Sequence, residues 1–151
     1  MRNNGNATAS LTSSDSIDVA GNAIAIALLT AVASVSALGI DQRASASGAG
    51  DASASASNSG AITVSASGQA QSTTDAANAN VDADGIYQLV TTPSGEGTAT
   101  IANSDDVQVT AQASAMASLT ATAHALADGA EQTVNVGTGN VSASVTNSAT
   151  L

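Results

Sequence analysis

The sequence predicts an all-β protein: a parallel β-helix or β-solenoid built from repeats of about 45 residues, with two coils in each repeat. Three observations predict this fold. Short turn-like motifs recur at a nearly fixed spacing, apolar and polar residues alternate between them, and most apolar residues are alanine. Each observation points to one part of the architecture, namely its period, its strands and its interior.

The period is carried by a motif that begins with Asn-Ser. Residues 58–64 recur as residues 103–109, an earlier copy spans residues 13–19, and a truncated copy spans residues 147–151, with steps of 45, 45 and 44. A glycine lies eight residues before each copy. These glycines are Gly5, Gly50, Gly95 and Gly139. A second marker, Gly-Ile-x-Gln or a close variant, occupies residues 39–42, 85–88 and 129–132, with steps of 46 and 44. Two markers that share one period indicate a true repeat.

The markers divide the chain into one repeat domain over residues 1–151. Its parts are a partial repeat at 1–4, repeats at about 5–49, 50–94 and 95–138, and a partial repeat at 139–151. We expect an excised fragment, or a subunit that is continued by its neighbours. Neighbouring repeats, or other copies of the chain associated end to end or laterally, are therefore the expected partners.

Between the markers the chain alternates with a period of two. From Val107 to Ala127 every odd position is apolar and most even positions are polar. Such alternation places the two sets on opposite faces of a strand. Helix is the alternative, because alanine is the best helix former. However, Ser, Thr, Asn and Gly at alternate positions suit a helix poorly, so strand is favoured.

The interior follows from composition. Hydrophobic residues make up 43% of the chain, yet it has no Phe, no Trp and one Tyr. Inward alanines would give a thin, flat core that depends on stacking of coils, and disorder is the competing interpretation. Asn-Ser-Gly and Asp-Gly are typical of turns. Because residues 58–62 resemble residues 83–86, each repeat is expected to hold two coils of roughly twenty residues.

Charge excludes some function classes. The chain has 12 acidic and 2 basic residues, which gives a formal net charge of −10. No basic cluster is available to neutralise phosphates, so nucleic acid is excluded as a partner. There is no cysteine, and therefore no disulfide or zinc–thiolate site. No cofactor is expected.

Catalysis is not expected either. His124 is the only histidine and falls on the polar face of a predicted strand, with no specified nucleophile or carboxylate beside it. The polysaccharide-cleaving β-helix enzymes need clustered acids, bases and aromatic sugar platforms, which Tyr87 alone cannot supply. Arg2 and Arg43 are isolated in the sequence and are expected to be solvated.

Calcium is the most plausible ligand, because oxygen-rich turns with carboxylates suit it. Asp82 and Asp84 flank a turn-like segment, and Asp105 and Asp106 form a pair. Neither pair recurs in the other repeats, so ordinary solvated acids are the favoured interpretation and no metal site is assigned.

Residues 19–38 form an uncharged, rather apolar stretch of about the length of a membrane span. The alternative is the first repeat in register with the others. In that register Ile24, Ile26 and Leu28 occupy outward positions that hold Gln69, Gln71 and Thr73 in the next repeat. An apolar outer face on one repeat predicts a contact with another subunit or domain.

The motifs together resemble the repetitive stalks of bacterial autotransporter or haemagglutinin-type adhesins. The resemblance rests on Gly-x-Ala-Ser/Thr-Ala, Asn-Ser-x-x-Ile/Val-x-Val-x-Ala, Ala-x-Ala-x-Ala and Gly-Ile-x-Gln, from Gly5 to Leu151. It implies a secreted or surface-exposed parallel β-helix that acts as a structural or adhesive stalk or passenger, with a host surface or glycan as possible partner. Residues 1–5 lack the charged-then-apolar order of a secretory signal, so secretion is implied by the resemblance alone.

A second resemblance is to functional amyloid subunits of the curli and Fap kind. They share Ala-, Gly-, Asn- and Gln-rich repeats, and Gln42, Gln88 and Gln132 could form the stacked ladders of a cross-β assembly. This resemblance implies the alternative function, a self-assembling extracellular filament whose subunits stack end to end.

Overall fold

The computed structural model describes residues 5–151, and over this range the chain forms ten β-strands and no helix. The strands are β1 (Ala7–Ser13), β2 (Ile17–Ala27), β3 (Ala31–Ser45), β4 (Ala52–Asn58), β5 (Ile62–Ser72), β6 (Ala76–Ser94), β7 (Gly97–Asn103), β8 (Val107–Met116), β9 (Thr120–Thr138) and β10 (Val141–Asn147). The prediction of an all-β fold is confirmed. The apolar stretch at residues 19–38 lies on β2 and β3, and no helix suited to crossing a membrane occurs in the described range.

The strands form three parallel sheets, with the orders β1-β4-β7-β10, β2-β5-β8 and β3-β6-β9. Each strand from β1 to β7 pairs in parallel with the strand three places further along the chain. The chain therefore visits the three sheets in turn and returns one strand higher, which is the path of a parallel β-solenoid. Alternating Ala and Ser have weak intrinsic preference for strands, so pairing and burial hold these residues extended.

The expected pair of coils within each repeat is not present. Ala7 pairs with Ala52, and the Asn58 and Asn103 side chains, 45 residues apart, are hydrogen-bonded. Two coils per repeat would instead pair residues roughly twenty apart. Residues 83–86, predicted to form a second turn, lie within the continuous strand β6. The Asp-Gly sequence marks a bend within that strand.

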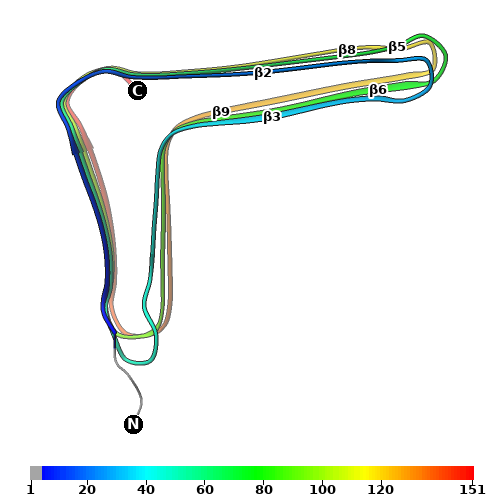
Figure 1. Ribbon diagram of the computed structural model, residues 1–151. Coiled ribbons are helices and arrows are strands. Elements are labelled where there is room, and N and C mark those ends of the chain that lie inside the picture. Colours follow the sequence, from blue (N-terminus) through cyan, green and yellow to red (C-terminus); the bar gives the residue numbers. More distant parts are fainter. Residues whose placement is uncertain (1–4) are drawn as a thin grey trace.

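Viewed down the stack, the coil has an L-shaped outline with two narrow arms (Figure 1). In one arm the β2-β5-β8 sheet faces the first halves of β3, β6 and β9. In the other arm the β1-β4-β7-β10 sheet faces their second halves. The strands of the third sheet are long because each of them runs through both arms. The bend of that sheet forms the inner corner of the L.

The core is thin in the arms and thicker at the corner. The buried cluster towards the tip of the β2–β3 arm consists of alanines alone. Its members are Ala31, Ala33, Ala70, Ala77 and Ala79. The corner holds larger aliphatic side chains, including Ile62, Ile86 and Ile101, each at most 1% exposed. Alanine side chains let two sheets approach closely, whereas the widening corner must be filled by larger groups. The predicted thin interior is confirmed for the arms.

The bend also changes which residues face inward. Along β6 the inward positions are Val81 and Ala83 before the bend and Ile86, Gln88 and Val90 after it. The spacing from Ala83 to Ile86 is three instead of two, so the alternation shifts by one residue. A Cβ added to Gly85 would lie 2.5 Å from the carbonyl oxygen of Gly129 in the next coil, so the close approach requires glycine.

The alternating run from Val107 to Ala127 is extended, as predicted, but it is not one strand. It divides into β8 and β9, with a turn at residues 117–119 that forms the tip of the arm. β8 and β9 each pair with a strand on one side only within the described chain. Their alanines are consequently more exposed than those of β5 and β6. The Asn-Ser motifs lie at turns between sheets, as expected.

Candidate functional site

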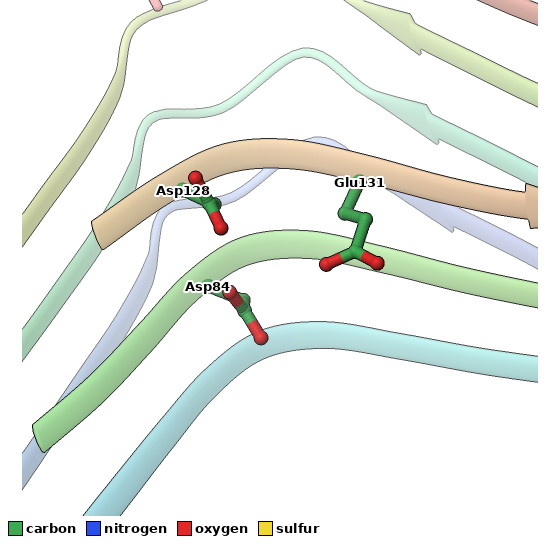
Figure 2. Close-up of side chains that lie close together, drawn as sticks. All are labelled: Asp84, Asp128 and Glu131. Carbon is green, nitrogen blue, oxygen red and sulfur yellow. The ribbon is translucent and has the colours of Figure 1, made fainter. Parts of the chain in front are cut away.

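Three carboxylates meet at the inner corner of the L. Asp84 lies on β6, and Asp128 and Glu131 lie on β9, so that one oxygen of each is within 4.8 Å of the other two. Figure 2 shows the Glu131 side chain reaching from β9 towards β6, close to both aspartates. Asp84 and Asp128 are direct neighbours in the parallel register. We refer to these three residues as the corner cluster.

The bend creates this cluster. In an uninterrupted strand, Asp128 and Glu131 would point to opposite faces, because they are separated by an odd number of residues. The shift in alternation at Gly129 brings both side chains to the outer side of the sheet, in the concave corner. Alternation alone therefore could not identify Glu131 as a member of the site.

Asp84 is the least accessible member of the cluster. The residue is 8% exposed, and no described residue is hydrogen-bonded to its carboxylate. Leu38 of the preceding coil lies next to it in register. Burial, followed by repulsion from Asp82, Asp128, Glu131 and Asp41, raises the pKa of Asp84 to about 6.

Among residues 5–151, one cationic side chain lies near the corner. Arg43 donates hydrogen bonds to both carboxylate oxygens of Asp41, each at 3.1 Å, and its guanidinium lies 5.5 Å from the ring centroid of Tyr87. The Arg43 side chain is 63% exposed and therefore solvated, as expected, but it is not isolated, because Asp41 lies two residues away on the same face of β3. Arg2 lies outside the described residues. Since Arg43 is already paired with Asp41, no cationic side chain of the described part of the chain is paired with the corner cluster.

The other predicted calcium ligands do not join this cluster. Asp82 lies two residues before Asp84 on β6, and one of its carboxylate oxygens is buried without a hydrogen bond. Asp105 and Asp106 lie in an exposed turn instead. There the Asp105 carboxylate accepts a hydrogen bond from the Asp106 amide, and the Asp106 carboxylate accepts one from the Thr150 amide. Asp105 and Asp106 therefore stabilise a turn.

A ladder of glutamine side chains crosses the second arm. Gln88 donates to the side-chain oxygen of Gln42 at 2.7 Å, and Gln132 donates to that of Gln88 at 2.9 Å. Each of the three side-chain amides also donates to a main-chain carbonyl of the opposite sheet. Gln42 donates to Ser55, Gln88 to Thr100 and Gln132 to Ser144. Gln88 is 0% exposed. The ladder thus joins successive coils and also joins the two sheets of the arm.

An asparagine ladder runs along the outer corner, at the Asn-Ser turns. Asn58 donates to Asn103, and Asn103 donates to Asn147, both at 2.8 Å. Each Asn also donates to the carbonyl two residues further on. The first coil has Ser13 at this position, in register with Asn58, and the Asn58 side-chain oxygen is buried without a donor.

An apolar patch covers the arm tip on the first coil. Ile24, Ile26 and Leu28 are 61%, 73% and 74% exposed, so they point outward as the sequence predicted. Leu29 and Val32 extend the patch around the turn, with 69% and 61% exposure. These two were missed because the turn at residues 28–30 interrupts the alternation. We refer to these five residues as the tip patch.

The remaining sequence candidate is remote from these features. His124 lies exposed on β9, in register with Asn80, and no carboxylate is hydrogen-bonded to it among the described residues. In comparisons with known proteins, no family model matches the chain, and no curated protein or solved structure matches it either.

Proposed function

We propose that this chain is a structural, non-catalytic segment of a secreted or cell-surface protein, a β-solenoid stalk or passenger. The observation that carries the proposal is the pair of amide ladders, through Gln88 and through Asn103, which repeat the same contact from coil to coil. Repeated, self-matching coils are typical of elongated scaffolds whose stability grows with each stacked unit. Adhesion to a host surface or glycan belongs to the same proposal and rests on the family resemblance.

We infer further that one sequence repeat of about 45 residues corresponds to one coil. The in-register partners Gln42, Gln88 and Gln132 support this inference, since each occupies the same place in its own repeat. A scaffold built in this way would tolerate gain or loss of whole repeats, because the remaining coils would meet through equivalent residues.

Deletion of one complete coil tests the scaffold. Removal of residues 50–94 joins two equivalent positions, and we expect the shortened chain to keep its strand circular dichroism and a cooperative transition at lower temperature. Removal of residues 50–71 is the matched control, because it shifts the later strands out of register. Loss of structure in the first variant, or equal stability of the two, would contradict the coil-by-coil scaffold.

The alternative is a filament in which separate copies stack end to end. The observation that favours it is the chemical likeness of successive coils, since a strand such as β9 offers the same alternating surface that β6 offers to it. Edge strands of this kind can pair with a second chain. In that case coils of different molecules would meet in the way that coils of one molecule do.

Imaging separates the two candidates. Incubated at neutral pH for hours, a stalk segment should remain as discrete particles, whereas a filament subunit should form uniform fibres. Ala123→Lys places a charge on the inward row of β9 and should abolish fibres, because stacking would bury that charge. Thr122→Lys, on the outward row, should leave them intact. Fibres that form equally in both variants would argue against stacking through β9.

A further inference from the structure

The corner cluster collects negative charge that no described side chain neutralises. Asp84 and Asp128 face each other directly in register, and like charges in that position destabilise a sheet. Glu131 adds a third carboxylate within 4.8 Å. Protonation or a cation from solution must offset this repulsion, because Arg43, the nearby cation, is paired with Asp41.

Two further observations point to a ligand. Asp84 is 8% exposed, and no described residue donates a hydrogen bond to its carboxylate, although a carboxylate of so buried a residue is normally paired. On the same strand, one oxygen of Asp82 is also buried and without a partner. On the side of the first coil, the register neighbour of Asp84 is the apolar Leu38, which offers no oxygen ligand from its side chain. On the side of the third coil, Glu131 is exposed to solvent. The cluster is thus an oxygen-only site with one buried wall and an open entrance.

The chemistry of these donors selects a hard divalent cation. Ca²⁺ takes carboxylate oxygens at about 2.3–2.6 Å in flexible geometry, so two of its ligands can lie up to about 5 Å apart. Mg²⁺ requires near-octahedral geometry at about 2.1 Å and retains its water. The three carboxylate oxygens of the corner cluster lie within 4.8 Å of one another, a span that the larger ion can bridge with little movement.

We propose that Asp84, Asp128 and Glu131 bind one Ca²⁺ at the inner corner, between the second and third coils, with water completing the coordination. The ion would bridge β6 and β9 at the point where the sheet bends. It would therefore strengthen the contact between these two coils. This inference is independent of whether the chain serves as a stalk or as a filament.

Calcium titration of the full 151-residue chain tests the proposal. By calorimetry at pH 7.5, we expect one Ca²⁺ per chain with a dissociation constant of about 10⁻⁴–10⁻³ M, the range of open extracellular sites. Ca²⁺ at tenfold excess over that constant should raise the melting temperature by about 3–6 °C relative to EDTA. Binding should weaken at pH 5, because protons compete for the same oxygens.

Variants locate the site. Asp84→Asn and Glu131→Gln should each abolish the calcium-dependent rise in melting temperature. Because they also remove repulsion, they should melt at or above the wild-type temperature in EDTA, which distinguishes loss of a ligand from failure to fold. Asp18→Asn, an exposed acid on β2, is the control and should respond to Ca²⁺ as wild type does.

Three results would overturn the proposal. The first is the absence of binding heat and of any change in melting temperature up to 10-fold above the expected dissociation constant. The second is a calcium response that survives in both Asp84→Asn and Glu131→Gln, because the ion would then bind elsewhere. The third is Mg²⁺ binding that equals or exceeds Ca²⁺ binding, which contradicts the assignment of the larger ion.

Discussion

The side-chain amide of Gln88 donates to the side-chain oxygen of Gln42, 2.7 Å away, although the two residues are 46 positions apart. The same amide donates to the Thr100 carbonyl at 3.1 Å, and the Gln88 oxygen accepts from Gln132. One fully buried side chain thus connects three coils and both sheets of an arm. In an interior made mostly of alanine, such polar contacts give each coil a specific register.

Replacement of Gln88 by Ala should lower the free energy of unfolding by about 3 kcal/mol, because one buried and two half-buried polar groups lose a partner. Gln69→Ala makes the same chemical change at an exposed position of β5 and should cost less than about 0.5 kcal/mol. Urea denaturation followed by circular dichroism measures both. Equal costs for the two variants would show that the ladder contributes nothing specific.

Replacement of Ser13 by Asn should stabilise the protein by about 1 kcal/mol. Ser13 is in register with Asn58, whose side-chain oxygen is buried without a donor, and an Asn amide there would extend the asparagine ladder by one coil. Ser57→Asn, at an exposed neighbouring position on β4, should leave stability unchanged. Thermal melts of the three proteins would decide, and an unchanged melting temperature for Ser13→Asn contradicts the ladder.

Stability should depend on pH through Asp84. Burial and neighbouring carboxylates raise its pKa in the folded state to about 6, above the ordinary value, so the folded protein holds a proton that the unfolded chain releases. The stabilisation from this group is complete below about pH 4 and is lost as pH rises towards 6 and beyond. Melting temperatures from pH 4 to 8, measured in EDTA, should therefore fall less steeply for Asp84→Asn than for wild type. Asp18→Asn should keep the wild-type slope.

The tip patch should mediate self-association. Ile24→Gln/Ile26→Gln gives the first coil the residues that the second coil carries at Gln69 and Gln71, so the fold should tolerate the change. Sedimentation velocity should show concentration-dependent association of wild type and its loss in the double variant. Leu126→Gln removes an exposed aliphatic residue of β9 outside the patch and should leave association intact. An entirely monomeric wild type would contradict a contact between copies at this patch.

The sequence allowed prediction of the strands and of their two faces, because alternation requires only a period of two. It also located the Asn-Ser turns and the outward position of Ile24. The sequence did not distinguish a turn from a bend at Gly85, since both need a residue without a Cβ. Because a turn was predicted there, two coils were expected in each repeat, whereas the strand continues through Gly85. The alternation shifts by one residue at the bend, and this shift arises from the folded coil. Glu131 lies after the bend and was therefore missed, whereas Asp84 lies before it and was found.

The width of the coil limits how far such a scaffold can extend. Equivalent side chains such as Asn58 and Asn103 are 45 residues apart in sequence, yet they lie on adjacent strands. Adjacent strands are about 4.8 Å apart, so a column of 100 Å would require about 20 coils, or roughly 900 residues. A single α-helix of that many residues would extend more than about 1,000 Å. A long polypeptide thus produces a short, broad wall, and most of its residues lie in the two arms of the L (Figure 1).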